Sequence, residues 1–250
     1  MKKINREFTR KKTHEDFHRG TVSQYKFIRK DNFTYRLILE ILEKYLRARS
    51  SVLDIGCGSG TLSFYLANKD HQVTGIDISE KAIKSCKKTA VNLGIKNANF
   101  IVMDFPNEIP KEKYDFIIFT EVLEHLPDDK FALRKIHSLL NPKGILFLTT
   151  PSINAPLHKL GLTKKFDKEV GHLRRYQLDE LVVTCEKTGF KVLETKKSEG
   201  ILRNFLFTNA VAGKLVRLIK FKASDIVTFL DNISINLFGE SDVIIIAQKS

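Results

Sequence analysis

Two short apolar runs, each ending in an aspartate, constrain the fold of this chain more than any other feature. The first is VLDIGCGSG, from Val52 to Gly60, and the second is VTGIDIS, from Val73 to Ser79. A glycine-rich turn between a strand and a helix brings the backbone close to a ligand, because no Cβ atom stands in the way. We therefore expect a strand–turn–helix unit whose ligand meets two carboxylates, one at the end of each strand.

Apolar runs alternate with helical patterns from residue 51 to residue 150, which predicts βαβ units and an α/β fold with a doubly wound sheet. The expected strands cover residues 51–55, 72–76, 99–103, 114–119 and 144–149. The expected helices lie near residues 60–68, 79–93 and 128–140. Further along, we expect a loop over 152–176, a helix over 178–188, and strands over 190–197 and 242–248.

The same patterns divide the chain into three regions. Residues 1–50 are expected to form a basic leader and an N-terminal helical cover, and residues 51–198 with 241–250 form the ligand-binding domain. Residues 199–240 are a helical insert before the last strand. Its first part, 201–222, is predicted to be a helix that carries basic residues among many apolar ones, so the insert is expected to serve as a lid, an interface or a peripheral membrane contact.

The glycine spacing discriminates between two classes of ligand. Dinucleotide-binding turns have the pattern G-x-G-x-x-G, with the pyrophosphate at the helix N-terminus. This chain has Gly56, Gly58 and Gly60, and Thr61 follows. Asp54, directly before the turn, is a poor neighbour for a pyrophosphate and a good one for an ammonium group. The turn therefore favours S-adenosylmethionine over a dinucleotide, while Asp77 suits the ribose hydroxyls of either ligand.

Further motifs follow in order: MDF at Met103–Phe105, TEVLEHLPDD at Thr120–Asp129, and GHLRRYQLDEL from Gly171. With these motifs the chain resembles the Rossmann-like S-adenosylmethionine-dependent methyltransferases, nearest the small-molecule branch that includes the ubiquinone-biosynthesis O-methyltransferases. The resemblance covers roughly residues 50–150 strongly and 172–198 more weakly. It implies a sheet of seven strands whose last strand runs antiparallel to its neighbours.

The resemblance also implies the residues that bind the cofactor. The glycines would pass under its methionine part, Asp54 would lie near its ammonium group, and Asp77 would accept hydrogen bonds from its ribose. Asp104 would accept a hydrogen bond from the adenine amino group, and Glu121 would stand where donor and acceptor pockets meet. The full expected set is Asp54, Gly56, Cys57 (a small loop filler), Gly58, Gly60, Asp77, Ile78 and Phe105 (both flanking adenine), Asp104 and Glu121.

Methyl transfer from a sulfonium needs alignment and exclusion of water, and a general base helps where the acceptor must lose a proton. His172 is the candidate base, because it lies in a basic segment where the family usually contacts its acceptor. His125, Arg174, Arg175 and Tyr176 are the candidate acceptor contacts, and arginines favour carboxylate or phosphate groups. The acceptor is thus expected to be a small molecule that is hydrophobic, anionic or lipid-linked. We see no metal-ligand pattern in the sequence.

The net charge of +13 leaves other partners open, because its excess lies outside residues 51–150, which are neutral overall. An RNA or protein methyltransferase is one alternative, although no RNA-binding module is recognisable and nucleic acid is not favoured as a partner. A NAD-dependent oxidoreductase and a non-catalytic nucleotide-binding protein are the others. The three cysteines have no metal or disulfide spacing, and the polar first twenty residues do not resemble a signal peptide, so we expect a cytoplasmic protein.

Overall fold

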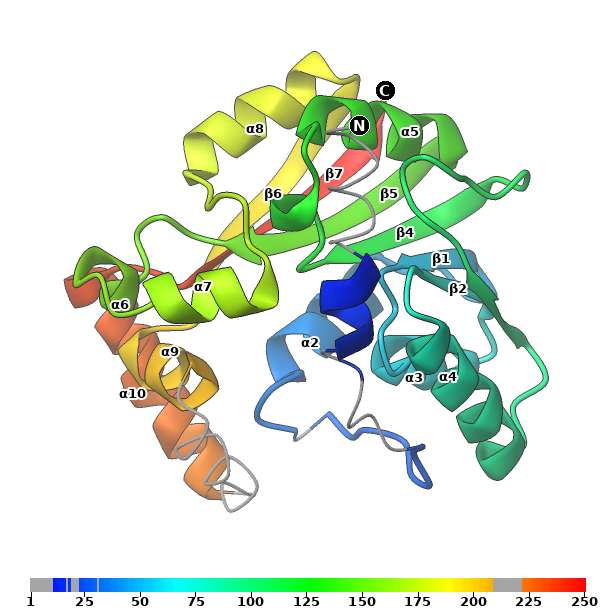
Figure 1. Ribbon diagram of the computed structural model, residues 1–250, viewed down its shortest axis with the longest axis horizontal. Helices are drawn as coiled ribbons and strands as arrows, with labels where there is room; N and C mark the ends of the chain where they lie inside the picture. Colours follow the sequence, from blue (N-terminus) through cyan, green and yellow to red (C-terminus); the bar gives the residue numbers. More distant parts are fainter. Residues whose placement is uncertain (1–10, 17, 19–22, 31, 209–221) are drawn as a thin grey trace.

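A sheet of seven strands forms the centre of the molecule (Figure 1). The computed structural model describes residues 11–16, 18, 23–30, 32–208 and 222–250. The strand order across the sheet is β3-β2-β1-β4-β5-β7-β6. The strands are β1 (Ser51–Ile55), β2 (Gln72–Asp77), β3 (Ala98–Val102), β4 (Tyr114–Thr120), β5 (Leu140–Pro151), β6 (Phe190–Ser198) and β7 (Asp242–Lys249).

The strand directions confirm the expected topology. β1 pairs in parallel with both β2 and β4, and β4 pairs in parallel with β5. β7 runs antiparallel to its two neighbours, β5 and β6. The chain order reverses between β1 and β4, and a crevice opens at the carboxyl ends of the strands at such a point.

Helices cover both faces of the sheet (Figure 1). On one face lie α2 (Arg36–Tyr45), α3 (Thr61–Ala67) and α4 (Glu80–Leu93), and on the other lie α5 (Asp129–Leu139) and α8 (Leu178–Lys187). Successive side chains of a strand point to opposite faces. In β4, Phe116 and Ile118 therefore pack toward α2 and α3, whereas Ile117 and Phe119 pack toward α5 and α8. All four are nearly fully buried, which is why this strand reads as a continuous apolar run.

The prediction of a loop over residues 152–176 is wrong. This segment contains two short helices, α6 (Pro156–Lys159) and α7 (Lys164–Val170). Helix α6 is only four residues long, and α7 buries none of its side chains. Neither helix therefore has the apolar periodicity by which a helix is recognised in a sequence.

The insert between β6 and β7 is helical, as expected. It contains α9 (Ile201–Thr208) and α10 (Lys222–Phe238), while the rest of the helix predicted over 201–222 lies outside the described residues. Asp231 of α10 is fully buried and accepts hydrogen bonds from the backbone N–H groups of Gly200, Leu202 and Arg203 at the start of α9. This carboxylate fixes the two helices to each other. Within the described part of the chain, no helix combines the length and apolar character needed to cross a membrane.

Candidate active site

A cavity of about 570 Å³ opens at the carboxyl ends of β1, β2 and β4, within the size range of small-molecule sites. Nine of the ten expected cofactor residues line it, and Gly60 is the exception. Among the expected acceptor-side residues, His125, His172 and Arg175 line the cavity and Arg174 and Tyr176 do not. Most of the expected residues therefore lie around one cavity, although they come from distant segments.

The glycine turn packs closely against neighbouring side chains. Gly56 has a φ of +72°, and a Cβ atom added there would lie 2.4 Å from Cγ2 of Val122. Gly60 has a φ of +76° and stands directly before α3, where an added Cβ would lie 2.7 Å from Cε2 of Phe64. Gly56 therefore leaves room for Val122 beside the cavity, whereas Gly60 leaves room for Phe64 of α3 and Cys86 of α4.

The two aspartates are held in different ways. Asp77 accepts backbone hydrogen bonds from Gly58 at 2.9 Å and Ser79 at 2.8 Å, so its carboxylate is fixed at the end of β2 with further lone pairs available to a ligand. Asp54 is 2% exposed and accepts a hydrogen bond of 2.5 Å from the Ser63 hydroxyl. Burial raises the pKa of Asp54 to about 6, and the neighbouring charge of Asp77 adds to that effect. A ligand with an ammonium group would favour the ionised form of this carboxyl.

The residues expected around adenine lie together at the β2–β3 side of the cavity. Ile78 and Asp104 line it, and Phe105 is buried with its ring edge-on to Phe119 at 5.7 Å. Cys57 is also buried, and its sulfur lies 3.0 Å from the position that a Cβ of Gly75 would occupy. The hydrogen bond with Cys86, together with burial, raises the pKa of the Cys57 thiol, so this thiol is not activated as a nucleophile.

Residues of the N-terminal segment complete the wall of the cavity. His14, His18 and Tyr35 line it, and the Gln24 amide donates to the Ser59 carbonyl at 3.1 Å and to the Thr61 hydroxyl at 3.0 Å. These contacts place the N-terminal cover over the glycine turn. The sequence offered no specific signal for them, because a polar leader has no apolar pattern that would indicate where it docks.

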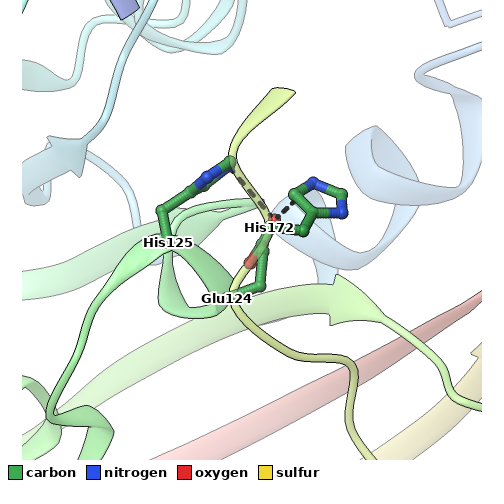
Figure 2. A group of neighbouring side chains, drawn as sticks. All are labelled: Glu124, His125 and His172. Atoms are coloured by element: carbon green, nitrogen blue, oxygen red, sulfur yellow. Dashed lines mark ion pairs between the residues drawn. The ribbon is translucent and has the colours of Figure 1, made fainter. Parts of the chain in front are cut away.

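Glu124, His125 and His172 converge on one point beside the cavity, whose wall includes the two histidines but not Glu124 (Figure 2). The carboxylate oxygen Oε1 of Glu124 is fully buried, has no hydrogen-bond partner among the described residues, and lies 3.7 Å from Nε2 of each histidine. Their ligand atoms lie within 4.8 Å of one another. Two ligands about 2.1 Å from a tetrahedral metal ion lie roughly 3.4 Å apart, so small side-chain movements would let all three residues hold one cation.

The remaining nitrogen of each ring is fixed by the protein. His125 Nδ1 is 3.1 Å from the Gly171 carbonyl, and His172 Nδ1 is 3.0 Å from Oδ1 of Asp167. Both partners are acceptors, so each Nδ1 carries the hydrogen and each Nε2 is directed to Glu124 as an acceptor. Burial lowers the pKa of His172 below its ordinary value, although the hydrogen bond to Asp167 opposes this, so its ring is neutral at neutral pH. A second carboxylate that orients a histidine in this way is typical of metal sites.

Asp167 is itself held by Arg175, which donates from Nη2 at 2.6 Å and from Nε at 3.1 Å. Burial alone would raise the pKa of Asp167, but these hydrogen bonds and the arginine charge hold it below its ordinary value. Arg175 therefore supports the position of His172. The guanidinium group of Arg175 already donates two hydrogen bonds to Asp167, so the structure gives no support for the expected contact between Arg175 and an anionic acceptor.

Arg174 and Tyr176 lie away from the cavity. Arg174 donates to Asp129 at 3.1 Å and to the carbonyl of Pro127 at 2.8 Å, and the Tyr176 hydroxyl lies 3.3 Å from the same Asp129 carboxylate. Successive side chains of an extended segment point in opposite directions, so Arg175 turns inward where Arg174 turns outward. The two residues thus belong to the contact between this segment and the start of α5.

Three further carboxyl groups line the acceptor half of the cavity: Glu121, Glu199 and Asp242. Burial within the protein, with the charge of Asp242, raises the pKa of Glu121 to about 8, although its carboxyl faces the cavity and is accessible to a ligand. Burial also raises the pKa of Glu199 to about 7 and that of Asp242 well above its ordinary value. These raised pKa values leave the three carboxyl groups partly or largely protonated near neutral pH, and a bound cation would favour their ionised forms whereas a bound anion would not.

Comparisons with known proteins agree with this geometry. Residues 26–195 match the model of a family described as a methyltransferase domain. The chain is 33% identical over 129 residues to a ubiquinone biosynthesis O-methyltransferase of Chromobacterium violaceum, covering 50% of this chain and 55% of that protein. It is 29% identical over 188 residues to the enzyme of that name from Haemophilus ducreyi, covering 68% of this chain and 78% of that protein. The chain spans about half the length of most of the curated relatives it matches.

Solved structures of methyltransferases share the fold. Magnesium protoporphyrin IX methyltransferase from Synechocystis PCC 6803, with bound S-adenosylhomocysteine, matches with a TM-score of 0.64 at 20% identity, covering 100% of both chains. A methyltransferase from Methanosarcina mazei matches with a TM-score of 0.56 at 23% identity, covering 84% of this chain and 96% of that one. The chain belongs to the methyltransferase domain family, and its recognition as a Rossmann-like S-adenosylmethionine-dependent methyltransferase is confirmed.

Proposed function

We propose that this protein transfers the methyl group of S-adenosylmethionine to a hydroxyl oxygen of a neutral small molecule, with a divalent cation at Glu124, His125 and His172. The observation that carries the proposal is the unpartnered, fully buried Oε1 of Glu124 between the two histidines. A buried carboxylate oxygen without a partner is costly, and a cation would remove that cost. The relatives from C. violaceum and H. ducreyi are named O-methyltransferases, which supports oxygen as the acceptor atom.

The residues at the cofactor end bind and orient the donor. S-adenosylmethionine supplies the methyl group when it is bound, as a sulfonium with a good leaving group. In our proposal, Asp54 attracts its ammonium group, Asp77 accepts from its ribose hydroxyls, and Gly56 and Gly58 allow the backbone to approach it. The side chains of Ile78, Asp104 and Phe105 contact adenine.

The residues at the acceptor end hold the hydroxyl in line and prepare it to lose a proton. A divalent cation held by one carboxylate and two imidazoles supplies a positive charge that lowers the pKa of a nearby hydroxyl. Such a mixed ligand set suits Mn²⁺ or Zn²⁺ better than a set of oxygens alone would. Asp167 and Arg175 keep His172 in place, and Glu121 stands between the two ends of the cavity.

An uncharged acceptor is favoured over an anionic one. Glu121, Glu199 and Asp242 line the acceptor half, whereas both buried arginines near it already face a carboxylate: Arg175 pairs with Asp167 and Arg203 lies 3.7 Å from Asp231. A carboxylate or phosphate on the acceptor would meet three carboxyl groups, and the two arginines of the described cavity wall already face other carboxylates. We propose that the acceptor is a phenol or another neutral hydroxyl compound.

The test is methyl transfer from labelled S-adenosylmethionine to a panel of neutral phenols and their carboxylated counterparts. The purified protein is assayed as isolated, after chelation, and after addition of Mn²⁺, Zn²⁺ or Mg²⁺. We expect transfer to neutral phenols only, loss of transfer on chelation, and recovery with a divalent cation. Glu124→Gln should lose at least about a hundredfold in rate, and Glu180→Gln, at an exposed position of α8, is the matched control. Transfer that survives chelation would contradict the cation and leave His172 as the general base.

A further inference from the structure

Helix α10 differs from an ordinary surface helix, because polar side chains are buried and large apolar side chains are exposed. Its buried side chains are polar: Asp231 is 0% exposed and Ser234 is 7% exposed. Both face α9, where Asp231 accepts from three backbone N–H groups and the Ser234 hydroxyl accepts from Ile201 N–H at 3.0 Å. The polar side of this helix is thus used to hold the insert together, which turns its apolar side outward.

The outward side of α10 is a continuous apolar face. It consists of Ile226, Phe229, Leu230, Ile233, Leu237 and Phe238, and each of these side chains is between 45% and 72% exposed. Their spacing places them along one side of a helix that extends about 20 Å over these residues. Single exposed apolar residues are normal, but an unbroken face of six marks a surface that contacts another apolar phase.

The apolar face continues onto the corner between α6 and α7. Leu160 and Leu162 at this corner are 68% and 67% exposed. Lys159 stands between this corner and the end of α10, because its ammonium group donates to the carbonyl of Phe238 at 3.4 Å. Figure 1 shows α6 and α10 side by side at the edge of the molecule farthest from α4.

The surface beside this face is positively charged at the corner between α6 and α7. At this corner, Asp167 is turned inward into its ion pair with Arg175, and Glu169 lies 3.8 Å from the ammonium group of Lys165. At the start of α10, Asp225 is paired with Arg36. An apolar helix face bordered by lysines is typical of elements that lie in the interface of anionic membranes. The exposed lysines of the corner are Lys159, Lys164, Lys165 and Lys168.

We propose that the α10 apolar face and the lysines beside it dock this protein on an anionic lipid surface. A second copy of the chain is a poorer occupant, since it would bring two lysine-rich corners together, whereas anionic lipid neutralises them. The docking surface adjoins the cavity: α9 contributes Arg203 and Asn204 to the cavity wall, and its Leu202 and Phe205 are exposed. The inference does not depend on the reaction proposed above, and it is tested without an activity measurement.

The experiment is co-sedimentation of the full chain with vesicles of phosphatidylcholine alone, or of equal parts phosphatidylcholine and phosphatidylglycerol, at ~0.1 M salt. We expect binding to the anionic vesicles only. Phe229→Ser and Leu237→Ser should each weaken it about tenfold, because each removes a large side chain from the lipid phase. Lys164→Gln with Lys165→Gln should weaken it about fivefold per lysine. Val91→Ser, at an 82% exposed position of α4, is the matched control.

Each outcome decides the proposal. All of these positions are exposed, so the variants should melt at the temperature of the unmodified protein and a loss of binding would reflect the surface itself. Absence of binding to anionic vesicles would overturn the proposal. So would binding that responds to the lysines but not to Phe229 and Leu237. If the unmodified protein is a dimer that these two serine variants dissociate, the face is covered by a second copy and the lipid surface is excluded.

Discussion

Replacing Asp54 with asparagine should stabilise the ligand-free protein and weaken its cofactor binding. Asp54 is 2% exposed, and burial raises its pKa to about 6 from an ordinary value of 3.8. Below pH 3.8 the carboxyl is mostly protonated in both the folded and the unfolded chain, so its burial does not lower the free energy of unfolding. Between pH 3.8 and about 6 the unfolded chain loses the proton more readily, and stability falls as the pH rises.

The structure sets the size of this effect. A pKa shift from 3.8 to about 6 corresponds to about 3 kcal/mol of lost stability above pH 6. An asparagine at this position would not carry this cost, but its hydrogen bond with the Ser63 hydroxyl would be weaker by about 1 kcal/mol. Asp54→Asn should therefore gain about 2 kcal/mol at about pH 7, which raises the melting temperature by about 4–8 °C. At about pH 4 the variant should be no more stable than the unmodified protein.

The assay is thermal unfolding from about pH 4 to about pH 8, with and without S-adenosylhomocysteine, which keeps the ammonium group of the donor. We expect the variant to bind this compound at least about tenfold more weakly, since a hydrogen-bonded charge pair contributes about 1.5–3 kcal/mol. Asp70→Asn, at an exposed turn, is the control and should alter neither property. A variant that is less stable at neutral pH, or a stability difference that does not change between acidic and neutral pH, would refute the reasoning.

Three further outcomes follow from particular contacts. Gly56→Ala should lose about 1–3 kcal/mol of stability, because its φ is +72° and the new Cβ would lie 2.4 Å from Val122; an unchanged melting temperature would contradict the turn geometry. Asp167→Asn should lower the pKa of His172 further, since it removes the carboxylate that favours the protonated ring; a histidine NMR titration that shows no change would argue against the contact. Asp231→Ala should cost about 3–5 kcal/mol in urea unfolding, because it removes a buried charge that caps α9; a loss below ~1 kcal/mol would mean that the insert is held otherwise.

The fold was largely predictable because its signals are local. β1 and β4 are buried on both faces and read as apolar runs, and each run predicted in the parallel part ends within two residues of where the structure ends the strand. The carboxyl ends of parallel strands share one edge of the sheet, so Asp54 and Asp77 were expected together from their strand positions, and the family resemblance added Glu121. The methyltransferase motifs then specified the ligand class.

The acceptor end was less predictable because it depends on tertiary contacts. His172 meets Glu124 only because the extended segment after α7 pairs with it, through the Leu173 N–H and the Glu124 carbonyl at 2.9 Å. Nothing in the spacing of Glu124, His125 and His172 indicates that contact, although adjacent Glu and His after a strand are a partial signal. Glu199 and Asp242 approach the same site from either side of the insert, at a sequence separation that no local pattern connects.

The inverted orientation of α10 was also hidden in the sequence. Its apolar residues have helical spacing, and the ordinary inference places such a stripe against the core. Only the cap that Asp231 provides to α9 shows which side faces inward. Where a polar side chain has a structural task, hydrophobic periodicity alone assigns the buried face wrongly.

The most direct test of the central claim is the melting temperature of the purified protein with S-adenosylhomocysteine and, separately, with NADH. A ligand at about 100 times its dissociation constant adds about 2.7 kcal/mol of stability, a shift of about 5–11 °C for a chain of this length. We expect that shift with S-adenosylhomocysteine alone, and a much smaller one in Asp77→Asn. A shift with NADH alone, or with neither compound, would contradict the assignment of this cavity to S-adenosylmethionine.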